Sequence, residues 1–140
     1  MPKSGPIILV DDDTDDQEIL KEVMQQLKVP NQLVIFKNGK EAEAYLRTTT
    51  QRPFLILCDI NMPVMTGLEL RDTIENDPVL KEKSIPFIFL STTGNPHMVR
   101  QAYNLTVQGF FQKKNNLHEL TNELKMIIEY WRACLHPNMV

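Results

Sequence analysis

The sequence predicts an α/β fold in which helices cover both faces of a parallel five-stranded sheet. Five apolar runs of strand length alternate with amphipathic stretches of helix length along the chain. Most of these runs are continuous rather than alternating, which is typical of strands that are buried on both faces. Strict alternation of strands and helices requires crossover connections, and these give parallel strands with helices above and below them.

Each predicted strand is bounded by polar or turn-forming residues. The strands are expected at residues 6–10, 32–36, 54–58, 86–90 and 107–111. The helices are expected at residues 14–28, 39–48, 67–76, 96–105 and 117–134. Thr14 and Gln17 have the spacing of a capping box at the start of the first helix. Gly67 is expected to relieve crowding at the start of the third.

One domain is expected for residues 1–140, with its core at about residues 6–134 and no output domain after it. Hydrophobic residues make up 42% of the chain, enough to bury a core at this length. The two cysteines form no disulfide framework. His97, His118 and His136 lack metal-ligand spacing and are expected at the surface.

Charge and hydropathy exclude several classes of protein. A net charge of −3 argues against a nucleic-acid-coating protein, because phosphate binding needs a concentrated basic face. No apolar run reaches the ~20 residues that span a membrane. The opening segment "MPKSGP" leads directly into a strand, without room for a signal peptide. A cytoplasmic protein without membrane or nucleic-acid partners is therefore expected.

Chemistry-bearing residues follow the predicted strands. The first strand ends in "DDDTDD" (11–16), the third in Asp59, the fourth in "STT" (91–93), and the fifth in two lysines. In a flavodoxin-like doubly wound sheet of strand order 2-1-3-4-5, strands one and three are neighbours ~4.8 Å apart. The carboxylates of Asp11, Asp12 and Asp59 should therefore converge.

Such a cluster needs a positive charge. Two carboxylates ~5 Å apart repel by roughly 3 kcal/mol at an effective dielectric of ~20. Mg²⁺ suits the cluster, because it takes one or two carboxylates, keeps several waters and favours phosphate. Lys113 adds an ammonium and Ser91 a hydroxyl, which completes a set suited to phosphoryl transfer. Because an aspartate can be a covalent nucleophile toward phosphoryl groups, Asp59 is the predicted phosphoacceptor.

These motifs resemble the receiver domains of bacterial two-component response regulators, single-domain chemotaxis-type regulators among them. The resemblance runs from about residue 7 to about residue 131 through "ILVDDD", "LILCDINMPVMTGLEL", "IPFIFLSTT" and "GFFQKK". In the second motif, the proline four residues after the aspartate and the glycine eight residues after it both match. The segment "NDPVLKEKSIP" is similar to that of the short receivers that partner bacterial phytochromes.

The resemblance implies a metal site. The family's acidic pair falls on Asp11 and Asp12, and its phosphoacceptor falls on Asp59. The backbone carbonyl of Asn61 would be a further ligand to Mg²⁺. In this assignment Asp12, Asp59 and the Asn61 carbonyl hold the metal, and Asp11 orients its water.

The resemblance also implies a switch. The phosphate-sensing hydroxyl falls on Ser91, the lysine on Lys113 and the reorienting aromatic on Phe110. The family usually has a proline after its lysine, commonly with a cis bond, whereas this chain has Lys114. A non-proline cis bond costs ~3 kcal/mol or more, so a trans loop of different shape is expected there.

A phosphoacceptor switch rather than an ordinary enzyme follows, one that promotes its own phosphorylation and dephosphorylation. The implied donor is a histidine kinase or a histidine phosphotransfer protein, and the signal passes to a protein target that the sequence does not name. The switch would alter the surface formed by the fourth helix, the fifth strand and the fifth helix. A monomer or a homodimer is compatible with this role.

Two other classes use part of the same pattern. An aspartate-nucleophile phosphatase of the haloacid-dehalogenase type would use Asp11 as nucleophile and Asp13 as general acid. It also needs late acidic residues, usually an aspartate pair, and no aspartate follows Asp77. A flavin-binding module would need a hydroxyl- and glycine-rich loop after the first strand, where this chain has "DDDTDD".

Each candidate residue also has an ordinary structural role available. Aspartates at positions 11–16 stabilise a helix N-terminus, and Asp59 could cap a turn before Pro63. Ser91 could cap the fourth helix, Lys113 could be a solvated strand-end lysine, and Phe110 could be a core residue. It is the combination of Asp59 with the acidic pair that favours a phosphorylation site.

Overall fold

A computed structural model describes residues 2–137 of the chain. Its five strands form one parallel sheet in the order β2-β1-β3-β4-β5, as predicted. The strands are β1 Ile7–Val10, β2 Leu33–Phe36, β3 Leu55–Cys58, β4 Phe87–Ser91 and β5 Gly109–Gln112. The last strand begins two residues later than expected, at Gly109. Residues 107 and 108 precede it, although the Gln108 N–H already donates to Phe87 O of β4 at 2.9 Å.

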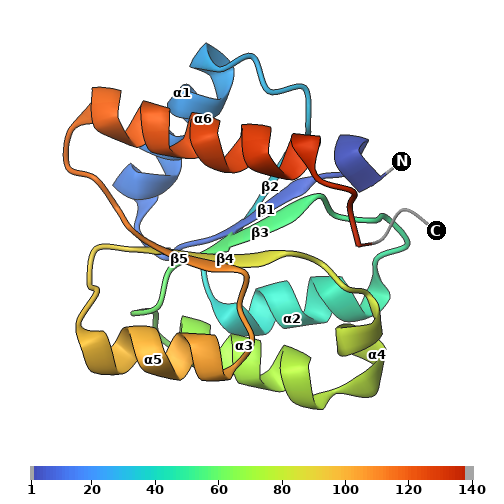
Figure 1. Cartoon of the computed structure of the whole chain (residues 1–140). Coiled ribbons are helices and arrows are strands. Elements are labelled where there is room, and N and C mark those ends of the chain that lie inside the picture. Colours follow the sequence, from blue (N-terminus) through green and yellow to red (C-terminus); the bar gives the residue numbers. More distant parts are fainter. Residues whose placement is uncertain (1, 138–140) are drawn as a thin grey trace.

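Helices cover both faces of the sheet (Figure 1). They are η1 Pro2–Ser4, α1 Thr14–Gln26, α2 Gly39–Thr48, α3 Gly67–Asn76, α4 Pro78–Glu82, α5 Pro96–Asn104 and α6 Leu117–Ala133. α1 and α6 lie on one face, and α2, α3, α4 and α5 lie on the other. α4 was not expected, since five residues are too few to show a helical period; Asp77 caps it by accepting from the N–H groups of Val79 and Leu80.

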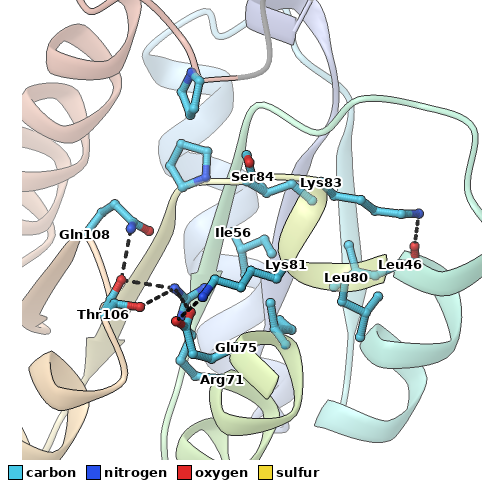
Figure 2. A pocket seen from close by; sticks show the side chains of 14 residues that line it. Leu46, Ile56, Arg71, Glu75, Leu80, Lys81, Lys83, Ser84, Thr106 and Gln108 are labelled. Carbon is cyan, nitrogen blue, oxygen red and sulfur yellow. Dashed lines mark hydrogen bonds and ion pairs between the residues drawn. The ribbon is translucent and has the colours of Figure 1, made fainter. Parts of the chain in front are cut away.

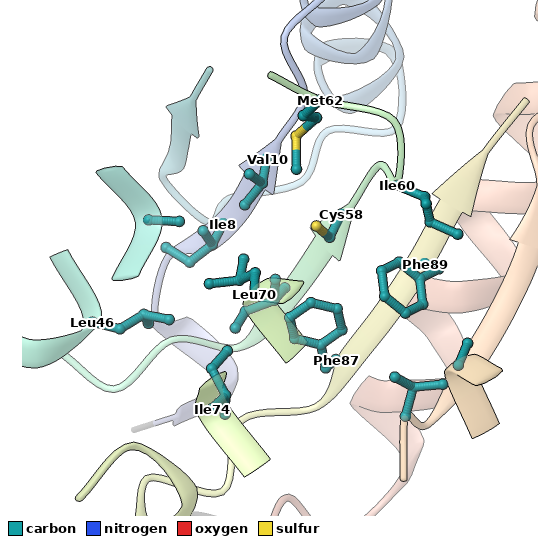
Figure 3. Packing of buried hydrophobic residues seen from close by; sticks show 14 of the residues in the cluster. Ile8, Val10, Leu46, Cys58, Ile60, Met62, Leu70, Ile74, Phe87 and Phe89 are labelled. Carbon is teal, nitrogen blue, oxygen red and sulfur yellow. The ribbon is translucent and has the colours of Figure 1, made fainter. Parts of the chain in front are cut away.

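Alternating side chains of the strands divide the core into two clusters. Ile8 and Val10 of β1 face α2 to α5, where they pack with aromatic rings of β4 (Figure 3). Ile7 and Leu9 of the same strand face α1 and α6. Both faces of each central strand are therefore buried, which explains the continuous apolar runs in the sequence.

The start of α1 differs from the prediction. Its N-cap is Asp13, whose carboxylate accepts from the N–H groups of Asp15 at 2.8 Å and Asp16 at 3.2 Å. Thr14 is already the first helical residue, and the Gln17 side-chain amide donates to the backbone carbonyl of residue 11 at 2.6 Å. The predicted Thr14–Gln17 capping box is therefore wrong. A capping box is present instead at the start of α3.

One histidine is also not where it was expected. His97 and His118 are exposed, but His136 is only 3% exposed. The chain after α6 folds back onto the sheet, so that His136 Nε2 donates to the carbonyl of Phe54 at 2.8 Å and the two rings stack. A surface position for His136 is therefore wrong. Within residues 2–137, no helix has the length and hydropathy needed to span a membrane.

Candidate functional site

The sheet places the predicted site residues at the edge where its strands end, here called the carboxyl edge. Asp59 directly follows β3, and its N–H donates to Val10 O of β1 at 2.9 Å. Lys113 follows β5, and its N–H donates to Ser91 O of β4 at 2.7 Å. Asp11 likewise continues the hydrogen bonding of β1 to β2, at 3.0 Å. These side chains therefore start from backbone that the sheet fixes.

Three carboxylates converge at this edge. Asp11, Asp12 and Asp59 each offer an oxygen, and these oxygens lie within 4.8 Å of one another. Asp11 is buried, Asp59 is half-buried and Asp12 is exposed, so the cluster opens to solvent on one side. The convergence predicted from the strand order is present in the structure.

Gly67 allows α3 to begin close to Asp59. Its N–H donates to Ile60 O at 2.8 Å, and a Cβ at this position would lie 2.1 Å from the backbone oxygen of Asp59. No side chain fits at that distance. The loop between β3 and α3 is thus held against the acidic cluster by a close approach that only glycine permits.

The surroundings of the two less exposed carboxyls disfavour their charged forms. Burial is the largest influence on Asp59 and raises its pKa, and the negative charge of Asp12 raises it further. Three groups lower the pKa without outweighing burial: the Ile60 N–H, the Lys113 ammonium and the Ser91 hydroxyl. Burial likewise raises the pKa of Asp11, although the Asp13 N–H and Lys113 oppose it. The cluster lacks enough positive charge to balance itself.

Lys113 is the cation of the site. Burial lowers its pKa, but Asp11 and Asp16 outweigh burial and raise the pKa above its usual value. Its Nζ donates to Asp11 Oδ2 at 3.0 Å and to Asp16 Oδ2 at 3.1 Å. Lys114 is exposed. The strand register therefore directs the first lysine to the carboxylates, as predicted, and the described residues contain no cis peptide bond.

Sequence reasoning missed the roles of two residues. Asp16 was interpreted as a helix-terminal charge, yet it shares the ammonium of Lys113. Thr93 was not singled out, but its Oγ1 lies 3.2 Å from Ser91 Oγ and 3.4 Å from Asn61 Nδ2. The sequence gives no distinct signal for Asp16, since every aspartate at positions 13–16 fits a helix N-terminus equally well.

The predicted switch residues lie beside the cluster. Ser91 is fully buried at the end of β4, where its hydroxyl lowers the pKa of Asp59. Phe110 is half-buried on β5, and the centre of its ring lies 5.8 Å from the centre of the Phe89 ring. A hydroxyl next to the acids and an aromatic ring on the adjacent edge strand are therefore in place.

The donor set fits a divalent cation that prefers oxygen ligands. Three carboxylate oxygens face one another, and two of these carboxyls have raised pKa values. A bound cation would relieve both the mutual repulsion and the cost of ionising buried groups. Asn61 follows Asp59 by two residues, and its side-chain amide turns to Thr93.

The phosphatase alternative is not supported. That chemistry needs Asp13 as a general acid, but the Asp13 carboxylate accepts two backbone N–H groups of α1. It therefore serves the helix and not the acidic cluster.

Comparisons with known proteins identify the family of this chain. Residues 7–125 match the family described as response regulator receiver domain. The chain is 32% identical over 130 residues to the response regulator Rcp1 of a Synechocystis strain. The alignment covers 89% of this chain and 87% of Rcp1. It is 33% identical over 133 residues to the Helicobacter pylori transcriptional regulatory protein CrdR, covering 95% of this chain and 59% of CrdR.

Solved structures give the same result. The phosphorylated cyanobacterial phytochrome response regulator RcpA superposes with a TM-score of 0.85 at 36% identity, covering 94% of this chain and 97% of that one. The Mn²⁺-bound form of Rcp1 superposes with a TM-score of 0.82 at 31% identity, with the same coverage. Receiver domains of this family take phosphoryl groups from histidine kinases and act as phosphoacceptor switches. This chain belongs to the response regulator receiver domain family.

Proposed function

We propose that this receiver accepts a phosphoryl group on Asp59, in a Mg²⁺-dependent reaction, from a phosphohistidine of a histidine kinase or histidine phosphotransfer protein. The observation that carries the proposal is the convergence of the Asp11, Asp12 and Asp59 oxygens within 4.8 Å. Asp59 is half-buried on rigid backbone, while Asp12 leaves the cluster open to an incoming donor. The likeness to a phytochrome response regulator supports a phytochrome-type kinase as that donor.

In the proposed reaction an Asp59 oxygen forms a bond to phosphorus. The nitrogen–phosphorus bond of phosphohistidine breaks, and the imidazole nitrogen leaves with the electron pair. The Lys113 ammonium, now bound to Asp11 and Asp16, would pair with the oxygens of the transferred group. The receiver thus supplies the groups that position and neutralise the phosphoryl group, and the same groups would serve its later hydrolysis.

Asp12, Asp59 and the backbone carbonyl of Asn61 would hold Mg²⁺, with Asp11 beside it. The metal would supply positive charge that neutralises the phosphoryl oxygens. Asp12 is the most exposed of the three acids and has no role in the helix cap, so its contribution can be tested separately.

After phosphorylation, Ser91 would turn its hydroxyl toward the phosphoryl group. The Ser91 hydroxyl now lies beside that of Thr93, and the centre of the Phe110 ring lies 5.8 Å from that of Phe89 on the neighbouring strand. Movement of the hydroxyl would let Phe110 repack and change the surface formed by α5, β5 and α6. The switch would be read by a protein target that recognises this surface.

The experiment is the intact mass of the protein after incubation with Mg²⁺ and acetyl phosphate. We expect a gain of one phosphoryl group, labile to base or hydroxylamine, and no gain in Asp59→Asn. Asp13→Asn is the matched control, because it alters an aspartate of the helix cap and leaves the three site carboxylates intact. The same labile adduct in Asp59→Asn would place the acceptor elsewhere.

The metal requirement has its own test. Asp12→Ala should abolish Mg²⁺ binding, measured by titration, together with phosphorylation. Binding to the native protein should be weak, roughly millimolar to sub-millimolar, as is typical of sites that substrate phosphate completes. Phosphorylation that persists after chelation with EDTA would refute the metal-dependent reaction.

A further inference from the structure

A cavity of about 430 Å³ lies at the edge where the strands begin, here called the amino edge, far from the acidic cluster. α3, α4, the segment between α4 and β4 and the turn between α5 and β5 form much of its wall (Figure 2). Apolar side chains, among them Ile56, Ile74 and Leu80, form part of the lining. The phosphorylation site proposed above contributes no residue to it.

The polar part of the lining is predominantly cationic. Among the described residues, Arg71, Lys81 and Lys83 supply three positive charges and Glu75 one negative charge. Glu75 pairs with Lys81 at 3.1 Å and with Arg71 at 3.2 Å, as Figure 2 shows. The Lys83 ammonium instead donates to the Leu46 carbonyl. Glu75 therefore faces two cations, Arg71 and Lys81, which leaves the cavity with an excess of one positive charge beside that carboxylate.

Arg71 is built into the wall rather than extended into solvent. It is 6% exposed, and its guanidinium lies 5.3 Å from the centre of the Phe87 ring. Nε donates to Leu105 O at 2.9 Å, and Nη2 donates to Thr106 O at 3.0 Å. A buried, fixed guanidinium is a preorganised anion-binding group, because little conformational entropy remains to be lost on binding.

We propose that this cavity binds a small amphipathic anion, with an apolar body against the isoleucine and leucine side chains and one carboxylate or sulfonate at the cationic wall. The volume falls within the ~300–1,000 Å³ range of small-molecule sites. The apolar lining favours a hydrocarbon or ring, and the excess of positive charge selects an anion over a cation or a neutral molecule.

The probes are 1-anilinonaphthalene-8-sulfonate, whose fluorescence rises in apolar surroundings, and octanoate as a competitor. We expect saturable binding of one sulfonate per protein and displacement by octanoate but not by octylamine. Amide shifts in nitrogen-15 NMR spectra should map to Arg71, Thr106 and the start of β4. Shifts at the acidic cluster instead, or the absence of saturation, would overturn the proposal.

Charge-reversal variants test the cationic wall. Lys81→Glu should weaken octanoate binding roughly three- to tenfold, because an exposed ammonium at the rim becomes a second carboxylate. Lys21→Glu is the matched control, since Lys21 is also an exposed lysine paired with a glutamate, on α1. Equal affinity in the two variants would show that the cavity cations do not hold the anion. Both substitutions lie on the surface, so both proteins should remain folded.

Discussion

Charged side chains have different partners at the two edges of the sheet. At the carboxyl edge, Asp11, Asp12 and Asp59 bring their oxygens within 4.8 Å, and the Lys113 ammonium is shared between Asp11 and Asp16. At the amino edge, the Arg71 side chain is about as buried as that of Lys113, but its guanidinium has two carbonyl oxygens and a carboxylate as partners. At the carboxyl edge, negative charges crowd together. At the amino edge, protein acceptors hold the buried guanidinium, and the positive charge in excess of Glu75 is that of the exposed Lys81 at the rim.

The difference suggests that the carboxylates at the carboxyl edge serve function, whereas the hydrogen bonds of Arg71 at the amino edge stabilise the fold. Uncompensated carboxylates raise the free energy of the folded protein until a cation or a phosphoryl group with its metal arrives. The Arg71 hydrogen bonds, by contrast, tie α3 to the turn before β5 whether or not a ligand is present. Substitutions at the carboxyl edge should therefore affect function more than stability, and those around Arg71 the reverse.

The largest effect on stability is expected at Arg71. Arg71→Met retains the aliphatic stem but removes the hydrogen bonds of the guanidinium to Leu105 O and Thr106 O and its ion pair with Glu75, so the free energy of unfolding should fall by about 2–4 kcal/mol. Urea denaturation measures this change. Arg47→Met is the control, because Arg47 pairs with two acids, one more than Arg71, but is exposed, and the midpoint of this variant should move far less. A similar shift in both variants would mean that burial of Arg71 is not what matters.

The next largest effect is expected on the rate of phosphorylation, which should depend on Lys113 but not on the adjacent Lys114. Lys113→Ala removes the cation that binds Asp11, so phosphorylation by acetyl phosphate should slow roughly 10- to 100-fold. Lys114→Ala should leave the rate nearly unchanged, because an exposed lysine beyond the site contributes within about 0.5 kcal/mol. Rates come from intact mass against time. Equal losses in the two variants would contradict the register assigned to β5.

The pH dependence of stability should reveal the carboxyl edge. Burial raises the pKa of Asp59 above its ordinary value of 3.8, so the folded protein retains a proton that the unfolded chain has released. This contribution to stability is fully present below pH 3.8 and is lost as the pH rises through the folded pKa.

Asp59→Asn removes that titration. In urea denaturation without Mg²⁺ from about pH 4 to about pH 7, the native protein should therefore lose stability relative to the variant as the pH rises. Added Mg²⁺ should reduce the difference at the higher pH. A gap between the two proteins that does not change with pH would show that Asp59 ionises in the fold as freely as in the unfolded chain.

The smallest effect is expected at Val64, in the loop after Asp59. Its φ of 68° is left-handed, which is unfavourable for a β-branched residue, and its side chain is 77% exposed. Val64→Gly should raise the free energy of unfolding by about 1 kcal/mol, since relief of strain exceeds the entropy gained by the unfolded chain. Val64→Ala keeps a Cβ and should gain less. A loss of stability in the glycine variant would refute strain at this position.

Local pattern predicted most of the fold and the centre of the site. The apolar runs identified all five strands. The pattern is clearest for the central strands β1 and β3, in which burial on both faces leaves no polar position. Asp59 stood out as a carboxylate at the end of such a run. Alternation with helices predicted a doubly wound parallel sheet. In the flavodoxin-like order, which the structure confirms, the sheet geometry brings Asp11 and Asp12 to Asp59.

Only the tertiary structure decided the contacts between residues distant in the sequence. Lys113 and Asp16 are 97 positions apart, and nothing local to Asp16 distinguishes it from the aspartates beside it. His136 is buried because the chain after α6 returns to Phe54, 82 positions away. The cavity around Arg71 likewise arises where several elements that are distant in the sequence meet. Periodicity determines which face of an element is buried, but the partner of a polar side chain depends on how complete elements pack together.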